Sequence, residues 1–335
     1  MFLSQDVSLS PTGEREALAM AKQISNYFYD IDVCFTSMLS RSQQTTRIVL
    51  EKLWEKQQSR PDDGQRKHHF RGSHAHFPPL FPRIVHCDYQ LNERHYGALQ
   101  GFVKKDVADG KCAAEIPGSD DPNLVASWRR SWFAVPPLLT DDDPRRLEEV
   151  EKWSPIMPIS KIPRGESLEM VAKDRVRPFL DDVLTPVLDE IAAYKHSNRD
   201  RKTNVQTTGL VIAHANSLRA LLGVLCEVED DPEALQILEA LRIPTGVPLV
   251  VYYQQCTNGK YRALPLPEAD NCIIQYDNGQ LVHPRQPPPG LGHPKLPVWP
   301  LDTCIPLHAH TAGTGDEAAE IAREPAMAAA RFFDY

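Results

Sequence analysis

The sequence lacks the marks of several protein classes. Its seven cysteines include no Cys-x-x-Cys pair, and this odd, scattered set does not indicate a disulfide framework. The first residues contain no basic segment followed by an apolar core, as a secretory signal would. No apolar run approaches the ~20 residues that a membrane span needs. These absences predict a cytoplasmic protein in a reducing environment, without a membrane partner.

Basic residues are also in deficit. Lysine and arginine number 37 against 45 aspartate and glutamate residues, which gives a formal net charge of −8. This balance argues against nucleic acid or an anionic membrane as a partner, although a local basic pocket could still bind a small anion. Hydrophobic residues make up 41% of the 335-residue chain, which is enough for a sizeable core. We therefore expect a folded protein, and a phosphorylated metabolite stays open as a ligand.

Two segments have the pattern of a strand followed by a helix. Residues 31–37 are typical of a short strand, and Ser37 is placed to cap a helix that follows. Residues 209–213 form a second buried strand pattern that leads into a helix at Asn216. A further helix is predicted for residues 10–29 and a further strand for 249–253. This order predicts the α/β class.

Other stretches interrupt the regular pattern. Residues 57–82 are rich in proline, glycine and polar residues and contain His68, His69, His74 and His76. A transition-metal site is one interpretation of these histidines, but their spacing is irregular, so a surface insertion is favoured. Eight prolines between residues 284 and 306 predict an irregular segment. Residues 277–335 are interpreted as a Pro-rich and Ala-rich tail.

The ends of the two predicted strands gather side chains that suit an anionic ligand. Ser37 and Arg41 follow the first strand, and His214, Asn216 and Arg219 follow the second. In open α/β sheets, ligands bind at the carboxyl ends of strands, where helix N-termini favour phosphate or carboxylate. The alternative is that His214 only forms a hydrogen bond in the core and Arg41 pairs with a surface carboxylate. The spacing leaves both interpretations open.

A polar, glycine-containing segment lies between these two turns, at residues 91–101. It is too polar for a core helix, so it is a candidate functional loop. Glu93 could transfer protons if burial raised its pKa, or it could form an ordinary salt bridge with Arg94. The sequence pattern does not decide between these roles.

The loop Leu91–Gly101 resembles the signature loop of the cofactor-dependent phosphoglycerate mutases, in the histidine phosphatase superfamily. Further matching segments occur in the same order: Leu9–Gly13, Phe35–Arg41, Trp128–Arg130, Gly165–Leu168, Ala213–Arg219 and Ile243–Pro248. The resemblance defines a mutase-like domain over residues 2–268. Insertions interrupt it near residues 57–82, 110–122 and 196–206.

The resemblance implies a three-layer α/β/α sandwich with a mostly parallel sheet. It also implies interconversion of 2-phosphoglycerate and 3-phosphoglycerate through a phosphohistidine, with 2,3-bisphosphoglycerate as phosphoryl donor and no metal. A homo-oligomer is left open. By motif, His214 is the second catalytic histidine and Glu93 the general acid/base. The implied substrate-binding residues are Arg41, Tyr96, Lys104, Arg129, Arg130 and Asn216.

Two positions depart from the family pattern. Ala215 stands where the family has glycine, and the family's Arg-His-Gly block, which carries the phosphorylated histidine, occurs nowhere in the 335 residues. With the family's first central strand missing, we expect two unpaired strand edges in the sheet. We expect the chain as given to form no phosphoenzyme. An incomplete form of an active mutase is favoured over an inactive phosphoglycerate-binding or scaffold relative, and a superfamily phosphatase is the third alternative.

Overall fold

The computed structural model describes most of the chain up to residue 255 and several short segments beyond it. The described residues are 6–27, 31–58, 85–197, 207–241, 243, 245–251, 253–255, 261–263, 275–277, 280–282, 296 and 298–300. The four histidines of the 57–82 insertion and the Ala-rich end of the tail lie outside them, as does most of the 196–206 insertion.

A three-stranded parallel sheet lies at the centre of the described structure. Strand β1 (Val33–Ser37) lies between β2 (Val85–Asp88) and β3 (Gly209–Ile212). The register pairs Thr36 with Ile212 on one side and with Cys87 on the other. The expectation of two unpaired strand edges is therefore wrong, because β1 and β3 pair directly with each other. The prediction of an α/β fold with a parallel sheet is confirmed.

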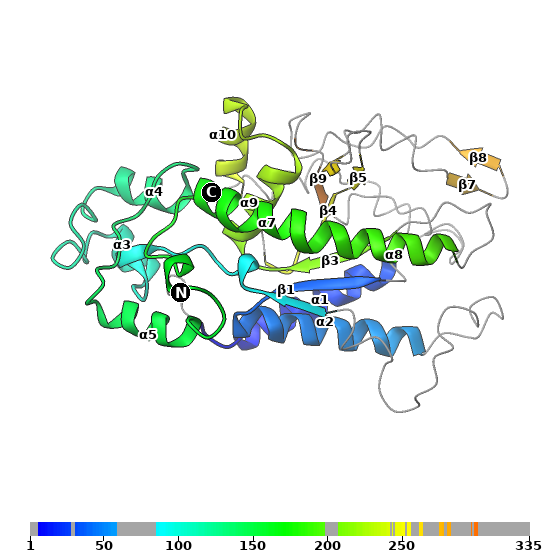
Figure 1. The fold of residues 1–335 in the computed structure, drawn as a ribbon, viewed down its shortest axis with the longest axis horizontal. Coiled ribbons are helices and arrows are strands. Elements are labelled where there is room, and N and C mark those ends of the chain that lie inside the picture. The colour runs from blue at the N-terminus through cyan, green and yellow to red at the C-terminus, as the bar shows by residue number, and fades with distance from the viewer. Residues whose placement is uncertain are drawn as a thin grey trace.

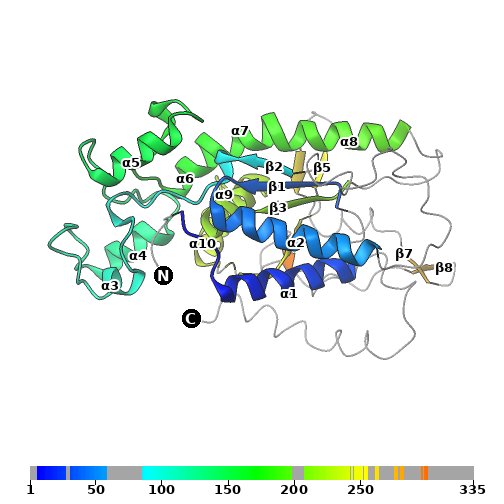
Figure 2. The same cartoon turned by 90° about the horizontal axis from the view of Figure 1, so that it is seen from below.

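Helices cover both faces of this sheet, which gives three layers (Figures 1 and 2). Helices α1 (Pro11–Tyr27) and α2 (Ser40–Gln58) pack on one face. Helix α9 (Ala215–Leu225) and a long helical segment over residues 168–197 pack on the other. Alternate residues of β1 serve the two cores, since Phe35 packs in one and Cys34 in the other.

The segment 168–197 is one long helical run with changes of winding. It comprises α6 (Leu168–Met170), the π-helical η4 (Val171–Val176), α7 (Arg177–Phe179), the π-helical η5 (Leu180–Leu184) and α8 (Thr185–Ser197). Pro178 and Pro186 lack the N–H group that an α-helix would use, and a π-helical turn precedes each of them closely. The run stays continuous, so it can cover the whole length of the sheet.

The remaining elements are shorter. They are η1 (Tyr89–Leu91), η2 (Gly97–Leu99), α3 (Lys104–Ala108), α4 (Pro122–Arg130), α5 (Pro144–Trp153), η3 (Ile159–Lys161), α10 (Pro232–Ala240), β4 (Leu249–Val251), β5 (Tyr253–Gln255), β6 (Tyr261–Ala263), β7 (Gln275–Asp277), β8 (Gln280–Val282) and β9 (Val298–Pro300). Three of the helices begin at an Asp-Pro pair. In each, the aspartate side chain accepts backbone N–H groups of the first turn, and proline takes the first helical position.

Two local expectations are wrong. Ser37 does not cap α2, because that helix begins at Ser40 and the Ser37 hydroxyl bonds elsewhere. The proline-rich segment is not irregular throughout. Leu296 and Val298 are buried in the same core as α9, and β9 pairs antiparallel with β4. Proline is compatible with this short strand because Pro300 lies at its end.

Candidate active site

The carboxyl ends of β1 and β3 meet at the candidate site. Ser37 is the last residue of β1, and His214 follows β3 by two residues and precedes α9. A hydrogen bond of 2.7 Å joins Ser37 Oγ to His214 Nε2, and both residues are buried. The backbone N–H of Leu39 also donates to Ser37 Oγ, at 3.3 Å. The two turns predicted from sequence therefore lie next to each other.

The imidazole of His214 is neutral at physiological pH. Burial lowers its pKa from 6.5 to about 4. The neighbouring Glu93 carboxylate acts in the opposite direction, while the Arg41 guanidinium lowers the pKa further. A neutral imidazole can accept a proton or donate one hydrogen bond. Glu93 and Arg41 are therefore near enough to His214 for their charges to act on it.

Glu93 itself is half-buried in the loop between β2 and η2. Its Oε1 accepts the backbone N–H of Arg94 at 2.8 Å, and among the described residues no ion pair joins the two side chains. Glu93 raises the pKa of Tyr96, for which burial is the larger cause. The Glu93 carboxylate is therefore near enough to Arg41, Tyr96 and His214 for its charge to act on all three.

Tyr96 and Asn216 are joined across this space. The Asn216 side-chain amide donates to the Tyr96 hydroxyl, and Asn216 in turn accepts from Arg219. All three side chains are buried. Of the predicted site residues, the structure thus gathers Glu93, His214, Arg41, Tyr96 and Asn216.

Arg94 belongs to the same group, although the sequence analysis assigned it only as a candidate partner of Glu93. Its side chain is 0% exposed, and its guanidinium lies over the Tyr96 ring, 4.6 Å from the centroid. Nη2 donates to the Trp128 carbonyl at 2.6 Å. Among the described residues, Nε and Nη1 have no hydrogen-bond partner. A buried cation with two unsatisfied donors is costly unless a ligand supplies acceptors.

Arg175 is a second cation that the sequence analysis missed. It comes from the long helical run, donates to the Asn92 carbonyl at 2.9 Å and pairs with the Glu166 carboxylate at 3.0 Å. It also contributes to lowering the pKa of His214. Arginines inside helices are usually solvated. The sequence around Arg175 therefore gives no sign that this side chain is buried beside the site, apart from the presence of Glu166.

The remaining predicted residues are less closely connected. Arg129 and Arg130 lie in the last turn of α4, and Arg130 is near enough to Arg219 to contribute to lowering its pKa. No described contact joins Arg129 to the group around His214. Lys104 is the first residue of α3, and its side chain is not described. Ala215 is exposed at the start of α9, so its methyl group meets no crowding in the part of the chain described.

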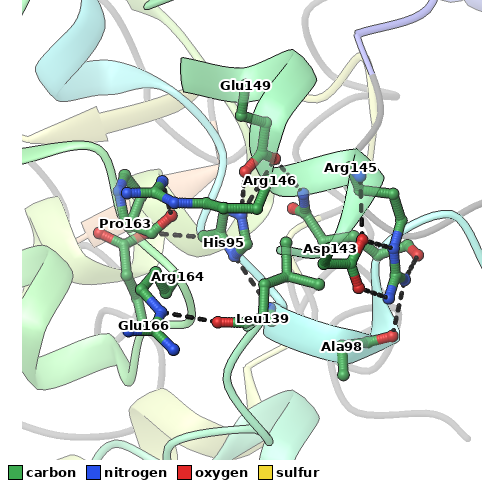
Figure 3. A network of polar contacts seen from close by, with 12 residues as sticks. His95, Ala98, Leu139, Asp143, Arg145, Arg146, Glu149, Pro163, Arg164 and Glu166 are labelled. Atoms are coloured by element: carbon green, nitrogen blue, oxygen red, sulfur yellow. Dashed lines mark hydrogen bonds and ion pairs between the residues drawn. The ribbon is translucent and has the colours of Figure 1, made fainter. Parts of the chain in front are cut away.

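A polar network holds the loop that carries Glu93, Arg94 and Tyr96 (Figure 3). The His95 ring donates from Nε2 to Glu149 of α5 at 2.8 Å and accepts the Gly97 N–H at Nδ1 at 2.9 Å. Both ring nitrogens are therefore engaged, so His95 does not offer a free nucleophile. Arg145 of α5 donates to the carbonyls of Ala98 and Gln100, at 3.0 and 2.8 Å. Helix α5 thus fixes the backbone of the loop.

Residue Gly97 shows how tightly this loop is held. Its φ of +56° lies in the left-handed region, and a Cβ atom there would lie 2.1 Å from the Pro137 carbonyl oxygen. Ala98 N–H also donates to that carbonyl at 2.7 Å. Only glycine fits this close approach of two backbone segments.

Other kinds of site are not indicated within the described residues. They contain no group of three or more His, Cys, Asp or Glu side chains placed to hold a metal ion. None of their helices combines the length and apolar character that crossing a bilayer demands.

Comparison with known proteins identifies the family of the chain. A family model described as histidine phosphatase superfamily (branch 1) matches residues 3–64. The 2,3-bisphosphoglycerate-dependent phosphoglycerate mutase of Nitratidesulfovibrio vulgaris (strain DP4) is 36% identical over 246 residues, covering 72% of this chain and 75% of that protein. The protein of the same name from Histophilus somni (strain 2336) is 32% identical and covers 76% of this chain and 87% of that one.

Among solved structures, a mycobacterial glucosyl-3-phosphoglycerate phosphatase is similar with a TM-score of 0.44 and 17% identity, covering 79% of this chain and 89% of that one. The sequence relatives carry the assignment. The chain belongs to the histidine phosphatase superfamily and, within it, to the family of 2,3-bisphosphoglycerate-dependent phosphoglycerate mutases.

Proposed function

We propose that this protein is a phosphoglycerate mutase that binds 2-phosphoglycerate and 3-phosphoglycerate at the carboxyl edge of the sheet, and that the 335 residues, which contain no Arg-His-Gly triplet, do not themselves form the phosphohistidine through which the family interconverts them. The two ligands carry a phosphate and a carboxylate, and both groups require positive charge and N–H donors. In this proposal 2,3-bisphosphoglycerate is the phosphoryl donor, and its acceptor would be the histidine of the family's Arg-His-Gly block, which these residues do not contain. The residues of the site fit such a ligand because they combine cations with a neutral imidazole and a carboxylate.

The observation that carries the proposal is the state of Arg94. Its buried guanidinium has two nitrogens without acceptors among the described residues, directly beside Tyr96. A polyanionic ligand would satisfy these donors and offset the cost of burying the charge. Arg41 adds a cation from the first turn of α2, where the helix terminus also favours an anion.

Glu93 and His214 take the catalytic roles in this proposal. Glu93 accepts the proton of the substrate hydroxyl as the phosphoryl group arrives and returns it in the reverse direction. His214 donates a hydrogen bond to a phosphoryl oxygen, which its neutral state allows from one ring nitrogen. Arg41 and Arg94 balance the charge of the transferring group.

A second candidate function is binding of phosphoglycerate without turnover. One specific contact favours it, because Ser37 Oγ engages His214 Nε2, so that nitrogen is not free for a ligand. The Arg-His-Gly triplet that carries the nucleophile in the family is also not found in the 335 residues. A phosphatase activity is the less favoured third alternative.

The test combines binding with turnover. Calorimetric titration with 3-phosphoglycerate should show binding that weakens with added salt, since the attraction is mainly between charges. Arg41→Ala should weaken it by about tenfold or more. The matched control is Arg177→Ala, which removes a half-exposed arginine paired with Glu229 on the surface, and should leave the affinity unchanged.

Turnover and labelling then separate the two functions. A mutase interconverts the two phosphoglycerates and acquires acid-labile phosphate from labelled 2,3-bisphosphoglycerate, whereas a binding protein does neither. In an active mutase, Glu93→Gln should lower kcat by about 10²–10⁴ with little change in substrate affinity. Absence of binding at low ionic strength would reject both functions.

A further inference from the structure

We propose that Arg219 is a positioning residue that sets the direction of the Tyr96 hydroxyl group. This inference rests on the proposed function and concerns how the same site binds its phosphoglycerate ligand. Arg219 itself does not touch the ligand. It acts through Asn216, which lies between it and Tyr96.

Arg219 is held rigidly by one end of α10. Its Nε donates to the Leu238 carbonyl at 3.0 Å, and its Nη2 donates to the Leu241 carbonyl at 2.6 Å. These carbonyls belong to the last turn of α10 and its C-terminal cap, where the helix dipole favours a cation. The third nitrogen, Nη1, points to Asn216 Oδ1. Arg219 is 7% exposed, so water hardly competes for these bonds.

The contact with Arg219 decides which way the Asn216 amide faces. A guanidinium can only donate hydrogen bonds, so the atom of Asn216 that faces it must be the oxygen. The amide nitrogen must then face Tyr96, and it donates to the phenolic oxygen. The usual ambiguity between the oxygen and nitrogen of an asparagine amide is removed by this arrangement.

The direction of the Tyr96 hydroxyl hydrogen follows. The phenolic oxygen already accepts from Asn216, and the Arg94 cation lies over the ring. Neither group can accept a hydrogen bond from the hydroxyl, so the hydrogen must point to a different acceptor. No described side chain is seen to accept this hydrogen, so it is available to an oxygen of the proposed ligand. In this arrangement Tyr96 is a preset donor for a phosphate or carboxylate oxygen of the ligand.

The test is a double-mutant cycle on 3-phosphoglycerate affinity, measured by calorimetry on the full chain. Tyr96→Phe removes the donor and should weaken binding about tenfold. Arg219→Lys keeps the charge but cannot form all three hydrogen bonds of the guanidinium, and should weaken binding by a similar factor. In the Tyr96→Phe background, Arg219→Lys should change the affinity less than twofold, because the hydroxyl that it orients is gone.

Two further variants keep the test decisive. Asn216→Leu has a similar side-chain volume, adds no charge, and can neither accept from Arg219 nor donate to Tyr96, so it should show the same dependence on Tyr96, even if Arg219→Lys fails to fold. Arg177→Lys, at a surface ion pair, is the matched control and should leave affinity unchanged. Equal losses in the Tyr96 and Phe backgrounds would overturn the positioning role while the proposed function stands. No binding by the unmodified chain would overturn both.

Discussion

Ser37 and His214 lie at the ends of two neighbouring parallel strands, with Ser37 Oγ 2.7 Å from His214 Nε2. The register explains this contact, because Thr36 pairs with Ile212, so the residues that follow in the two strands stay side by side. Backbone pairing thus places a hydroxyl directly against the imidazole. The sheet therefore positions Ser37 and His214, and the loop of residues 91–101 supplies Glu93, Arg94 and Tyr96.

Stability should depend on pH through His214. Its pKa is about 4 in the folded chain because of burial, compared with 6.5 for the free side chain. Between these values the unfolded chain binds more protons than the folded one, so stability is complete above pH 6.5 and falls as the pH decreases toward 4. The loss should amount to about 3 kcal/mol. Urea unfolding at several pH values measures it.

The control for this prediction is His214→Gln, which keeps a polar side chain but cannot titrate. Its stability should change less between pH 6.5 and pH 4 than that of the unmodified chain. Equal slopes in the two proteins would show that other groups cause the pH dependence.

The Gly97 position should tolerate no side chain. In Gly97→Ala the new Cβ would collide with the Pro137 carbonyl oxygen, at 2.1 Å, in a left-handed conformation. We expect a loss of roughly 2–4 kcal/mol in the free energy of unfolding. Gly110→Ala is the control, since Gly110 also has a positive φ of +71° but its nearest neighbouring atom would be 3.5 Å away. Its loss should be about 1 kcal/mol. Similar losses at both sites would contradict the close approach.

Much of the edge of the sheet could be predicted from the sequence. Strand patterns at 31–37 and 209–213, each followed by a helix, were sufficient to bring Arg41 and His214 to one edge, because parallel strands end on the same side. The starts of α4, α5 and α10 are also marked in the local sequence. Each begins at an Asp-Pro pair, and both the aspartate cap and the fixed proline φ favour a helix start.

The partners of Arg94 and Arg219 could not be predicted from local sequence. Arg94 donates to the Trp128 carbonyl, 34 residues away, and Arg219 donates to carbonyls at the end of α10. Backbone carbonyls carry no sequence signal of their own, so only the tertiary packing shows which arginine meets them. The direct pairing of β1 with β3 could not be predicted either. A buried strand can pair at either edge with any parallel strand of matching register, so its sequence does not specify which strand lies beside it.

Helix α5 should control the site through Glu149. In Glu149→Ala, the His95 ring N–H and the Gln100 amide both lose their acceptor. We expect a loss of about 1–3 kcal/mol in the free energy of unfolding, and weaker 3-phosphoglycerate binding because the loop bearing Glu93 and Tyr96 is no longer fixed. Thermal unfolding and calorimetry measure the two effects. Glu148→Ala, at the exposed neighbour on the same helix, should change neither quantity.

Arg94 should strengthen ligand binding but add nothing to the stability of the ligand-free chain. Arg94→Met keeps most of the side-chain length but removes a buried charge that has two donors without partners among the described residues. Removing that charge relieves its desolvation cost, while the lost bond to the Trp128 carbonyl leaves only one acceptor to satisfy. We therefore expect the ligand-free chain to be as stable as the unmodified one or more stable. Its affinity for 3-phosphoglycerate should fall by about tenfold or more.

Measuring both quantities on one variant separates binding from folding. Chemical unfolding in the absence of ligand reports the stability, and calorimetric titration at low ionic strength reports the affinity. Arg177→Met removes a half-exposed arginine and should leave affinity unchanged, since that side chain pairs with Glu229. A large loss of stability with unchanged affinity in Arg94→Met would mean that Arg94 supports the fold alone. The unsatisfied donors would then have no ligand to meet, and the observation on which the proposed function rests would be withdrawn.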